Sequence, residues 1–184
     1  MQGTDGELIR LAQSGDRQAF GGLVQLHQGR VFSFVRGLCR NPDQALDITQ
    51  DTFIKVWHAL PDWRPEARFE TWLLRIARNT TIDALRRRKH EPEALPDDAV
   101  LIDSGPSPLR QLESRRSIAQ LEALLAQLPV AQREVLLLRE VEGLSYRELA
   151  TALDISEGTV KSRLARARDA LLQARRTMTG ASDD

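Results

Sequence analysis

Apolar residues recur at spacings of three and four along most of the chain, and no stretch alternates Val, Ile or Thr with polar residues. This period is typical of amphipathic helices, so the sequence predicts an all-α protein. We expect a first helix over residues 5–14, ended by Gly15. Asp16 is the predicted N-cap of a second helix. The buried stripe of that helix is expected to comprise Phe20, Leu23, Val24, His27, Val31, Phe34, Val35 and Leu38.

Two further helices are predicted in the N-terminal half. Asn41-Pro42-Asp43 is a helix-start signal, and we expect the third helix to run from there to about Leu60. Pro61 and Pro65 bracket a loop, and a fourth helix is expected over 69–89. The third helix should bury Leu46, Phe53, Val56, Trp57 and Leu60. The fourth should bury Leu73, Ile76, Ala77, Thr80 and Ala84.

The middle of the chain changes character. Residues 90–109 contain four prolines, a glycine and five acidic side chains, a composition typical of linkers. Helical periodicity resumes near Leu112 and is interrupted at Pro129. We therefore predict two small helical domains, 1–90 and 112–178, joined by a flexible acidic linker over 91–111. Residues 179–184 should form a disordered tail.

The C-terminal domain carries a helix-turn-helix pattern. Ser145 and Glu148 are spaced as a capping box, and Leu144 and Leu149 are spaced as the hydrophobic staple around it. The short helix they begin should end near Leu153, followed by a turn and a longer helix. A helix over 133–142, ended by Gly143, should precede this pattern. Its expected inward residues are Val135, Leu136, Leu138 and Val141.

The longer helix separates two faces. Val160, Leu164, Ala167 and Leu171 share one face and are predicted to be core. The opposite face is small and polar, which lets a helix approach base edges, and it is flanked by cations suited to phosphates. The alternative is a solvated basic face. The candidate DNA-binding residues are Ser156, Glu157, Gly158, Thr159, Lys161, Ser162, Arg163 and Arg166.

Two helices of the N-terminal domain also present candidate surfaces. The third shows Asp47, Asp51, Ile54 and His58 on one side, which suits a basic partner helix, although most acidic helix faces are only solvated. The fourth shows cations beside Trp72, which suits a single nucleic-acid strand. The alternative is that Trp72, and with it Phe69 and Trp63, belongs to the core.

Charge and chemistry narrow the function. The chain has 26 basic and 26 acidic residues, but the cations gather over 86–89 and 161–176, where a polyanion would bind. Cys39 is the single cysteine, which excludes a disulfide framework, and we expect it to be a small buried hydrophobic residue. The first residues lack the features of an export signal, and no apolar run is long enough to span a membrane. We therefore expect a cytoplasmic protein.

No constellation typical of an enzyme is present. The chain has no phosphate-binding glycine loop, no clustered metal ligands and no spacing that supports a nucleophile with its base. We predict neither catalytic nor metal-binding residues, no cofactor and no small-molecule substrate. An enzyme with a DNA-binding appendage is thus disfavoured.

Several segments of the chain resemble motifs of a known family. Residues 47–57 and 69–79 look like regions 2.2 to 2.4 of bacterial sigma factors, and residues 144–150 and 158–163 look like region 4. The order and spacing of these motifs are similar to those of the extracytoplasmic-function (ECF) group of the sigma-70 family. A stand-alone helix-turn-helix regulator is the remaining alternative, but it would leave the N-terminal surfaces without a purpose.

The resemblance implies partners for each surface. Asp47, Gln50, Asp51 and Ile54 would dock on the β′ coiled coil of core RNA polymerase, and the β flap would be a further contact. The C-terminal helix would bind the −35 promoter element, and an inhibitory anti-sigma factor would cover these surfaces. Unlike the paired aromatics of primary sigma factors, Trp72 is followed by Leu73, which implies weaker promoter melting. The −10 element would be taken by Trp63, Phe69, Trp72, Arg75, Arg78, Asn79, Asp83 and Arg86.

Overall fold

The structure is a computed structural model that describes residues 2–39, 41–88, 121 and 123–180. Every regular element in these ranges is helical, which confirms the predicted all-α class. The chain divides into two compact units, Met1–Ala94 and Leu95–Asp184. The predicted linker over 91–111 lies outside the described residues.

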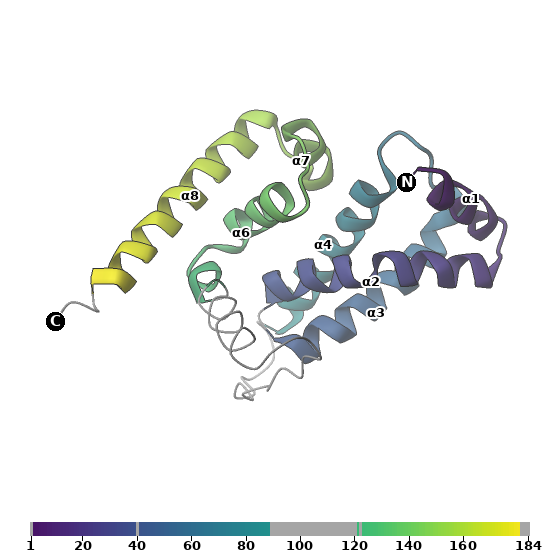
Figure 1. Ribbon diagram of the computed structural model, residues 1–184, viewed down its shortest axis with the longest axis horizontal. Helices are drawn as coiled ribbons and strands as arrows, with labels where there is room; N and C mark the ends of the chain where they lie inside the picture. The colour runs from purple at the N-terminus through teal and green to yellow at the C-terminus, as the bar shows by residue number, and fades with distance from the viewer. Residues whose placement is uncertain (1, 40, 89–120, 122, 181–184) are drawn as a thin grey trace, which may run out of the picture. The chain divides into compact units, whose positions relative to one another are not determined.

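In its described residues, the N-terminal unit is a bundle of four helices (Figure 1). They are α1 (Gln2–Gln13), α2 (Arg17–Cys39), α3 (Pro42–Ala59) and α4 (Phe69–Arg88), with the short 3-10 turn η1 (Leu60–Asp62) after α3. Helix α2 packs against α1, α3 and α4, and α3 also packs against α4. Helix α2 therefore forms the centre of the core, where Val31, Phe34 and Val35 are almost completely buried.

Local capping signals set where these helices begin. The Asp16 carboxylate accepts hydrogen bonds from the backbone N–H groups of Gln18 (2.8 Å) and Ala19 (3.1 Å), and so caps α2. The Asn41 side chain caps α3 by accepting from the N–H of Gln44 at 2.9 Å. Gly15 has a φ of 93°, a conformation that glycine adopts at little cost. The predicted caps and the end of α1 are confirmed.

The buried face of α3 differs from the predicted one. Leu46 was expected in the core but is 51% exposed, whereas Ala45 is completely buried. Threonines contribute to this face because each can satisfy its hydroxyl within the helix. Thr49 donates to the Ala45 carbonyl oxygen at 2.6 Å and Thr52 to that of Ile48 at 2.7 Å. The buried face is composed of Ala45, Ile48, Thr49, Thr52, Phe53 and Val56.

Helix α4 buries a wider face than predicted, for the same reason. Thr80 and Thr81 donate to the carbonyl oxygens four residues earlier, at 2.9 and 2.8 Å. Leu74 is also completely buried. Several residues expected in the core are only half-buried at its edge, namely Phe20, Val24, Trp57, Ile76 and Ala84.

The C-terminal unit contains α6 (Val130–Leu136), the π-helical turn η2 (Leu137–Val141), α7 (Tyr146–Leu153) and α8 (Glu157–Gly180). Helix α8 packs against both α6 and α7. The helix continues through residues 179 and 180, which were expected in the tail, while residues 181–184 lie outside the described part. Leu171, expected in the core, is half-buried, whereas Val160, Leu164 and Ala167 are buried as predicted.

The π-helical turn corrects one prediction. In η2 the N–H of Glu142 donates to the Leu137 carbonyl oxygen five residues earlier, at 3.2 Å. This wider turn accommodates an extra residue and shifts the positions that follow it around the helix axis. Val141, expected to point inward, is 63% exposed, and Leu137 is buried instead. Gly143 then ends the segment with a φ of 70°.

The helix-turn-helix is formed by α7, a tight turn and α8. The predicted capping box is present, because Ser145 Oγ accepts from the N–H of Glu148 at 3.2 Å and a Glu148 carboxylate oxygen accepts from the N–H of Ser145 at 2.8 Å. Asp154 takes the left-handed conformation, with a φ of 53°, and reverses the chain after α7. Ser156 Oγ accepts from the N–H of Thr159 at 3.1 Å and so caps α8.

Candidate nucleic-acid and polymerase interfaces

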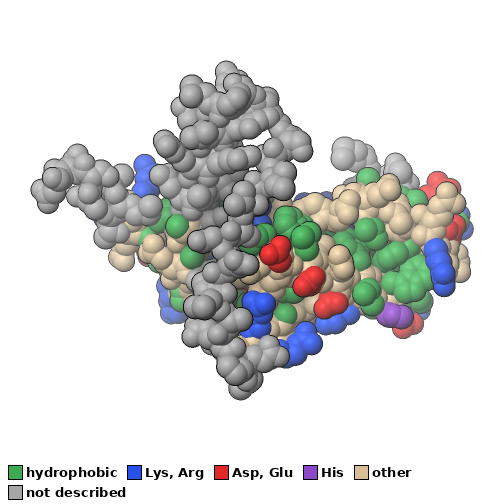
Figure 2. All heavy atoms as spheres, turned by 90° about the horizontal axis from the view of Figure 1, so that it is seen from below, with side chains coloured by type: hydrophobic (Ala, Val, Ile, Leu, Met, Phe, Trp, Pro, Cys, Tyr) green, Lys and Arg blue, Asp and Glu red, His purple; other side chains and the backbone are tan. Residues whose placement is uncertain are grey.

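The outer side of α3 carries an acidic stripe, defined here as Asp47, Gln50, Asp51 and Ile54. All four side chains are exposed, Ile54 to 57%. The exposed Leu46 flanks the stripe and adds apolar area that the sequence analysis had assigned to the core. Figure 2 shows acidic side chains lying among hydrophobic ones on one face of the molecule. Acidic groups around exposed aliphatic side chains form a surface suited to a basic helix with an apolar face.

Three rings form an aromatic cluster where the loop after α3 meets α4. The ring centroids of Trp63 and Phe69 lie 5.8 Å apart, those of Phe69 and Trp72 5.6 Å, and those of Trp63 and Trp72 6.1 Å. Phe69 is only 6% exposed, whereas both tryptophans are half-buried. Phe69 is therefore the buried base of the cluster, and the two tryptophans are its solvent-accessible rings.

A histidine lies beneath this cluster. His27 is 6% exposed, and its ring centroid lies 5.4 Å from that of Phe69. Burial lowers the pKa of His27 below its ordinary value; Asp5 and Glu70 act in the opposite direction, and Arg30 lowers the pKa further. The Nε2 atom lies 3.7 Å from an Asp5 carboxylate oxygen, too far for a hydrogen bond, and has no hydrogen-bond partner among the described residues. The neutral form therefore fits this environment.

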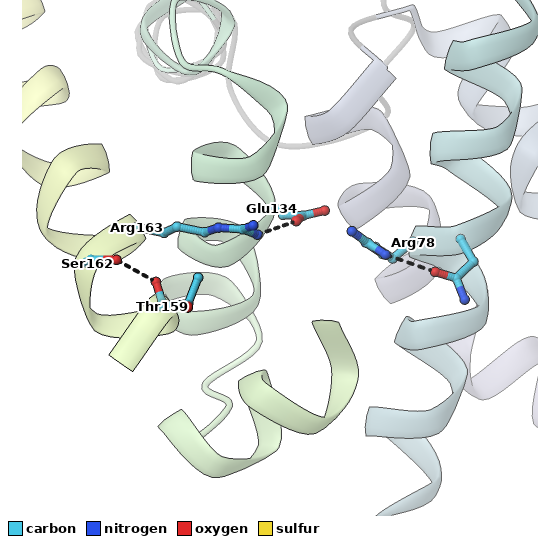
Figure 3. A network of polar contacts seen from close by, with 6 residues as sticks. Arg78, Glu134, Thr159, Ser162 and Arg163 are labelled. Atoms are coloured by element: carbon cyan, nitrogen blue, oxygen red, sulfur yellow. Dashed lines mark hydrogen bonds and ion pairs between the residues drawn. The ribbon is translucent and has the colours of Figure 1, made fainter. Parts of the chain in front are cut away.

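A polar strip on α4 continues from Trp72. Arg75, Asn79, Asp83 and Arg86 are exposed, and Arg78 is half-buried. Arg78 Nη1 donates to the Asn79 side-chain oxygen at 3.1 Å (Figure 3), which leaves the Asn79 amide nitrogen free to face outward as a donor. The structure thus places cations and an orienting amide beside the accessible tryptophan ring.

The outer face of α8 is formed by small and polar side chains. Gly158, Lys161, Ser162 and Arg166 are exposed, as are Ser156 and Glu157 at the helix start. Thr159 is half-buried, and its hydroxyl lies 2.9 Å from that of Ser156. Ser162 donates to the Thr159 carbonyl oxygen at 3.0 Å (Figure 3). The Ser162 hydroxyl therefore faces a ligand as an acceptor unless it gives up this bond.

Arg163 lies differently from the other candidates on α8. Its Nη1 atom lies 3.3 Å from a carboxylate oxygen of Glu134 on α6, and Figure 3 shows the side chain extending towards that residue. The Glu134 side chain is 2% exposed and that of Arg163 28%. Arg163 was predicted to flank the DNA-facing side. In the structure its guanidinium is also paired with this buried carboxylate, which links α8 to α6.

Sequence reasoning missed the buried charges of α6. Arg133 is 1% exposed, and its Nε and Nη2 atoms donate to the carbonyl oxygens of Leu125 and Leu128, both at 2.8 Å. These carbonyls end the helical segment before Pro129, where backbone acceptors lack partners within the helix. Pro129 ends the preceding helical segment, and this signal in the sequence implies carbonyl oxygens that need a donor. Hydropathy alone nevertheless predicts an exposed arginine, so Arg133 was not identified as that donor.

Two models of known families match the chain. The Sigma-70 region 2 model matches residues 23–91, and the model described as Sigma-70, region 4 matches residues 118–171. The RNA polymerase sigma-H factor of Pseudomonas aeruginosa is 36% identical over 183 residues, covering 94% of each chain. The ECF RNA polymerase sigma-E factor of Escherichia coli K12 is 35% identical over 177 residues, covering 91% of this chain and 92% of that protein. The chain belongs to the ECF group of the sigma-70 family.

As a member of this group, the chain is an alternative sigma factor, a subunit that directs RNA polymerase to promoters. A solved structure of the sigma factor RpoE in complex with the anti-sigma factor NepR from Bartonella quintana matches this sigma factor with a TM-score of 0.67 and 25% identity. The match covers 84% of this chain and 94% of that one. Both helical units are thereby accounted for, whereas the regulator interpretation explained only the second.

Among the described residues of the sigma factor, no three His, Cys, Asp or Glu side chains are arranged to hold a metal ion. Within the same ranges, no helix combines the length and apolarity needed to cross a membrane. Cys39 is buried, as predicted, and its Sγ donates to the Asn41 carbonyl oxygen at 3.3 Å.

Proposed function

We propose that the acidic stripe of α3 is where this sigma factor docks on the β′ coiled coil of core polymerase. The observation that carries the proposal is an exposed Ile54 set beside exposed carboxylates on the side of α3 that faces away from the core. Apolar contact supplies affinity, while the carboxylates select a basic partner and accelerate encounter. The β flap is the proposed contact of the C-terminal unit.

The −10 element is assigned to the aromatic cluster and the polar strip of α4. A base of the non-template strand taken out of the stack requires a ring to stack on and cations for the adjacent phosphates. Trp63 and Trp72 offer the rings, and Asn79 offers an amide for a base edge. The phosphate-binding and orienting groups are Arg75, Arg78, Asp83 and Arg86. Phe69 supports the tryptophans from below.

The −35 element is assigned to the outer face of α8. The residues near its N-terminus, Glu157, Gly158, Thr159 and Ser162, are placed to approach base edges in the major groove. Lys161 and Arg166 are exposed and suited to phosphates. Ser156 caps the helix and Arg163 orients it, so both support the contact from behind.

Regulation and location complete the proposal. The RpoE relative is seen in complex with an anti-sigma factor, and we infer that an anti-sigma factor likewise holds this protein inactive by covering its polymerase- and DNA-binding surfaces. The protein acts in the cytoplasm, where polymerase and promoters are. It is not itself an enzyme, because the polymerase performs the chemistry of RNA synthesis.

Run-off transcription with purified protein, core polymerase and a promoter library tests these assignments. Transcripts from specific promoters should require both proteins. Asp51→Arg should abolish them and prevent co-purification with core, because it reverses the charge in the centre of the stripe. Glu7→Arg makes the same charge change at an exposed position of α1 and should leave both unchanged. Undiminished core binding by Asp51→Arg would contradict the docking assignment, and specific duplex binding without polymerase, with no transcripts, would favour a stand-alone regulator.

A further inference from the structure

The last residue of α1 reaches into the loop that follows α3. Gln13 Nε2 donates to the carbonyl oxygen of Leu60 at 3.1 Å and to that of Trp63 at 3.0 Å. One amide nitrogen thus holds two carbonyls that lie 47 and 50 residues further along the chain. Both hydrogens of the amide are used, and the contact is partly buried, where hydrogen bonds are strengthened by the low local dielectric.

These carbonyls lie at the point where the chain leaves η1. The N–H of Trp63 donates to the Leu60 carbonyl oxygen at 3.1 Å, and Trp63 itself is extended, with φ −63° and ψ 134°. Within the described chain, the other side-chain hydrogen bonds of residues 60–68 reach only one or two residues along the sequence. Gln13 is therefore the long-range polar tie on this loop, and it acts at the residue that carries the accessible ring.

Helix α1 also approaches the aromatic cluster from its other end. Asp5 lies 3.7 Å from His27 Nε2, and the His27 ring packs against Phe69 at the base of the cluster. Between the two ends, Ile9 and Ala12 are buried and seat α1 on the bundle. The backbone of Trp63 is thus tied to α1 by hydrogen bonds, and the start of α1 lies close to the histidine that packs under Phe69.

We propose that α1 positions the loop over residues 60–68 and that Gln13 is a positioning residue for promoter recognition, acting through Trp63. This inference rests on the proposed −10 interface. Taking a base out of the stack is costly, so a loop that is ordered before binding loses less conformational entropy when it does bind. Gln13 touches no DNA in this scheme; it fixes the direction in which the Trp63 ring is presented.

Three variants distinguish a positioning role of Gln13 from a general contribution to the stability of the N-terminal unit. Gln13→Glu is nearly isosteric but removes both N–H donors and places a carboxylate against two carbonyl oxygens. Gln13→Lys keeps N–H donors at a similar reach. Gln25→Glu makes the same chemical change at an exposed position of α2 and is the matched control.

The readout is transcription by reconstituted holoenzyme from a library randomised separately at the −10 and −35 elements. Gln13→Glu should lower transcription from the preferred −10 sequence about thirtyfold, the change that two ordinary hydrogen bonds represent, and flatten the −10 base preference. The −35 preference and the affinity for core should be unchanged. Gln13→Lys should restore most of the preference, and amide hydrogen exchange of residues 60–68 should accelerate only in Gln13→Glu.

Asn79→Ala tells the two hypotheses apart. If Asn79→Ala leaves the −10 profile unaltered, the proposed −10 interface fails whatever Gln13 does. If Asn79→Ala alters the profile and Gln13→Glu does not, the role of α1 is overturned while the interface survives. Equal losses at −10, −35 and core binding, or no rescue by Gln13→Lys, would show a merely structural role and would also overturn the inference.

Discussion

Arg163 and Arg166 stand one turn apart on α8 and have different surroundings. Arg166 is exposed on the outer face, whereas Arg163 is paired with the buried Glu134 carboxylate. Removing a charged hydrogen-bond partner from a buried group costs more than removing an exposed cation. Two arginines of similar appearance in the sequence are therefore expected to affect different properties.

We expect Arg163→Met to destabilise the C-terminal unit by about 1–3 kcal/mol, because it takes a charged partner away from buried Glu134. Lys161→Met, at an exposed position two residues earlier, should stay within about 0.5 kcal/mol. Hydrogen exchange of the most protected amides of α6 and α8 measures the stability of both variants. Equal exchange in the two variants would mean that the Glu134 pair does not stabilise the unit.

His27 should make the stability of the N-terminal unit depend on pH. Its folded pKa lies below the ordinary value of 6.5 because of burial, so the unfolded chain binds the proton more readily. Stability is then complete above the ordinary pKa and is lost as the pH falls below it. Urea midpoints followed by tryptophan fluorescence should drop between about pH 7.5 and about pH 5.5.

The variant His27→Leu isolates this effect. It should show a smaller drop than the wild type over the same range, whereas His58→Ala, at an exposed position of α3, should follow the wild type. All three tryptophans, Trp57, Trp63 and Trp72, lie in the N-terminal unit, so fluorescence reports on that unit. A His27→Leu profile as steep as that of the wild type would assign the pH dependence to other groups.

The positions of the helices could be predicted well from the sequence, because the capping residues that mark where they begin act locally. Asp16, Asn41 and the Ser145–Glu148 box each act within three residues of a helix start, and all appear as expected. The inward faces were predicted less well, because they depend on packing. Periodicity assigned Leu46 to the core, yet the bundle buries Ala45 and two threonines whose hydroxyls bond to their own helix.

The π-helical turn is a second case in which regular periodicity failed. It lies inside a segment whose hydrophobic pattern suits an ordinary helix, so the shift in phase has no sequence signal of its own. We expect Leu137→Ala to cost about 2–5 kcal/mol, as for a buried leucine in general. Val141→Lys should change stability by less than about 0.5 kcal/mol. A large loss in Val141→Lys on thermal unfolding would indicate that Val141 is buried after all.

In the molecule as a whole, charge is separated rather than absent. The formal net charge is zero, but acidic side chains dominate the stripe on α3 and cations dominate the outer parts of α4 and α8. This separation suits the proposed assignment, in which the stripe meets a basic partner and the cationic faces meet DNA. The charge pattern of the sequence predicts where these charged faces lie, because the helical period determines which charged side chains share an exposed face.

We expect Arg166→Ala to weaken promoter binding by the holoenzyme and to reduce the slope of log affinity against log salt concentration by about 0.9, the value for one phosphate contact. Arg10→Ala removes an equal charge at an exposed position of α1 and should leave the slope unchanged. Titrations of promoter DNA at several salt concentrations measure this. An unaltered slope in Arg166→Ala would remove this side chain from the phosphate-binding set.

The sequence could not predict contacts in which a long side chain of one helix reaches a group on another element. Gln13 reaches carbonyls about 50 residues away, and Arg163 reaches a carboxylate 29 residues away. The burial of Phe69 beneath two half-buried tryptophans is likewise a product of packing. Such destinations are set by tertiary packing, which a pattern along one chain does not encode residue by residue.

The pairing of Arg163 with Glu134 has a consequence for protein engineering. Because α8 is held by Arg163, Val160, Leu164 and Ala167 on its inner side, its outer positions carry little of the fold. A side chain added at Gly158 would meet nothing closer than Ser156 Oγ, at 3.7 Å. On the proposed −35 assignment, a combinatorial library at Gly158, Ser162, Ala165 and Arg166 can therefore be selected for new promoter sequences, giving orthogonal regulators for synthetic gene circuits that share one unaltered scaffold.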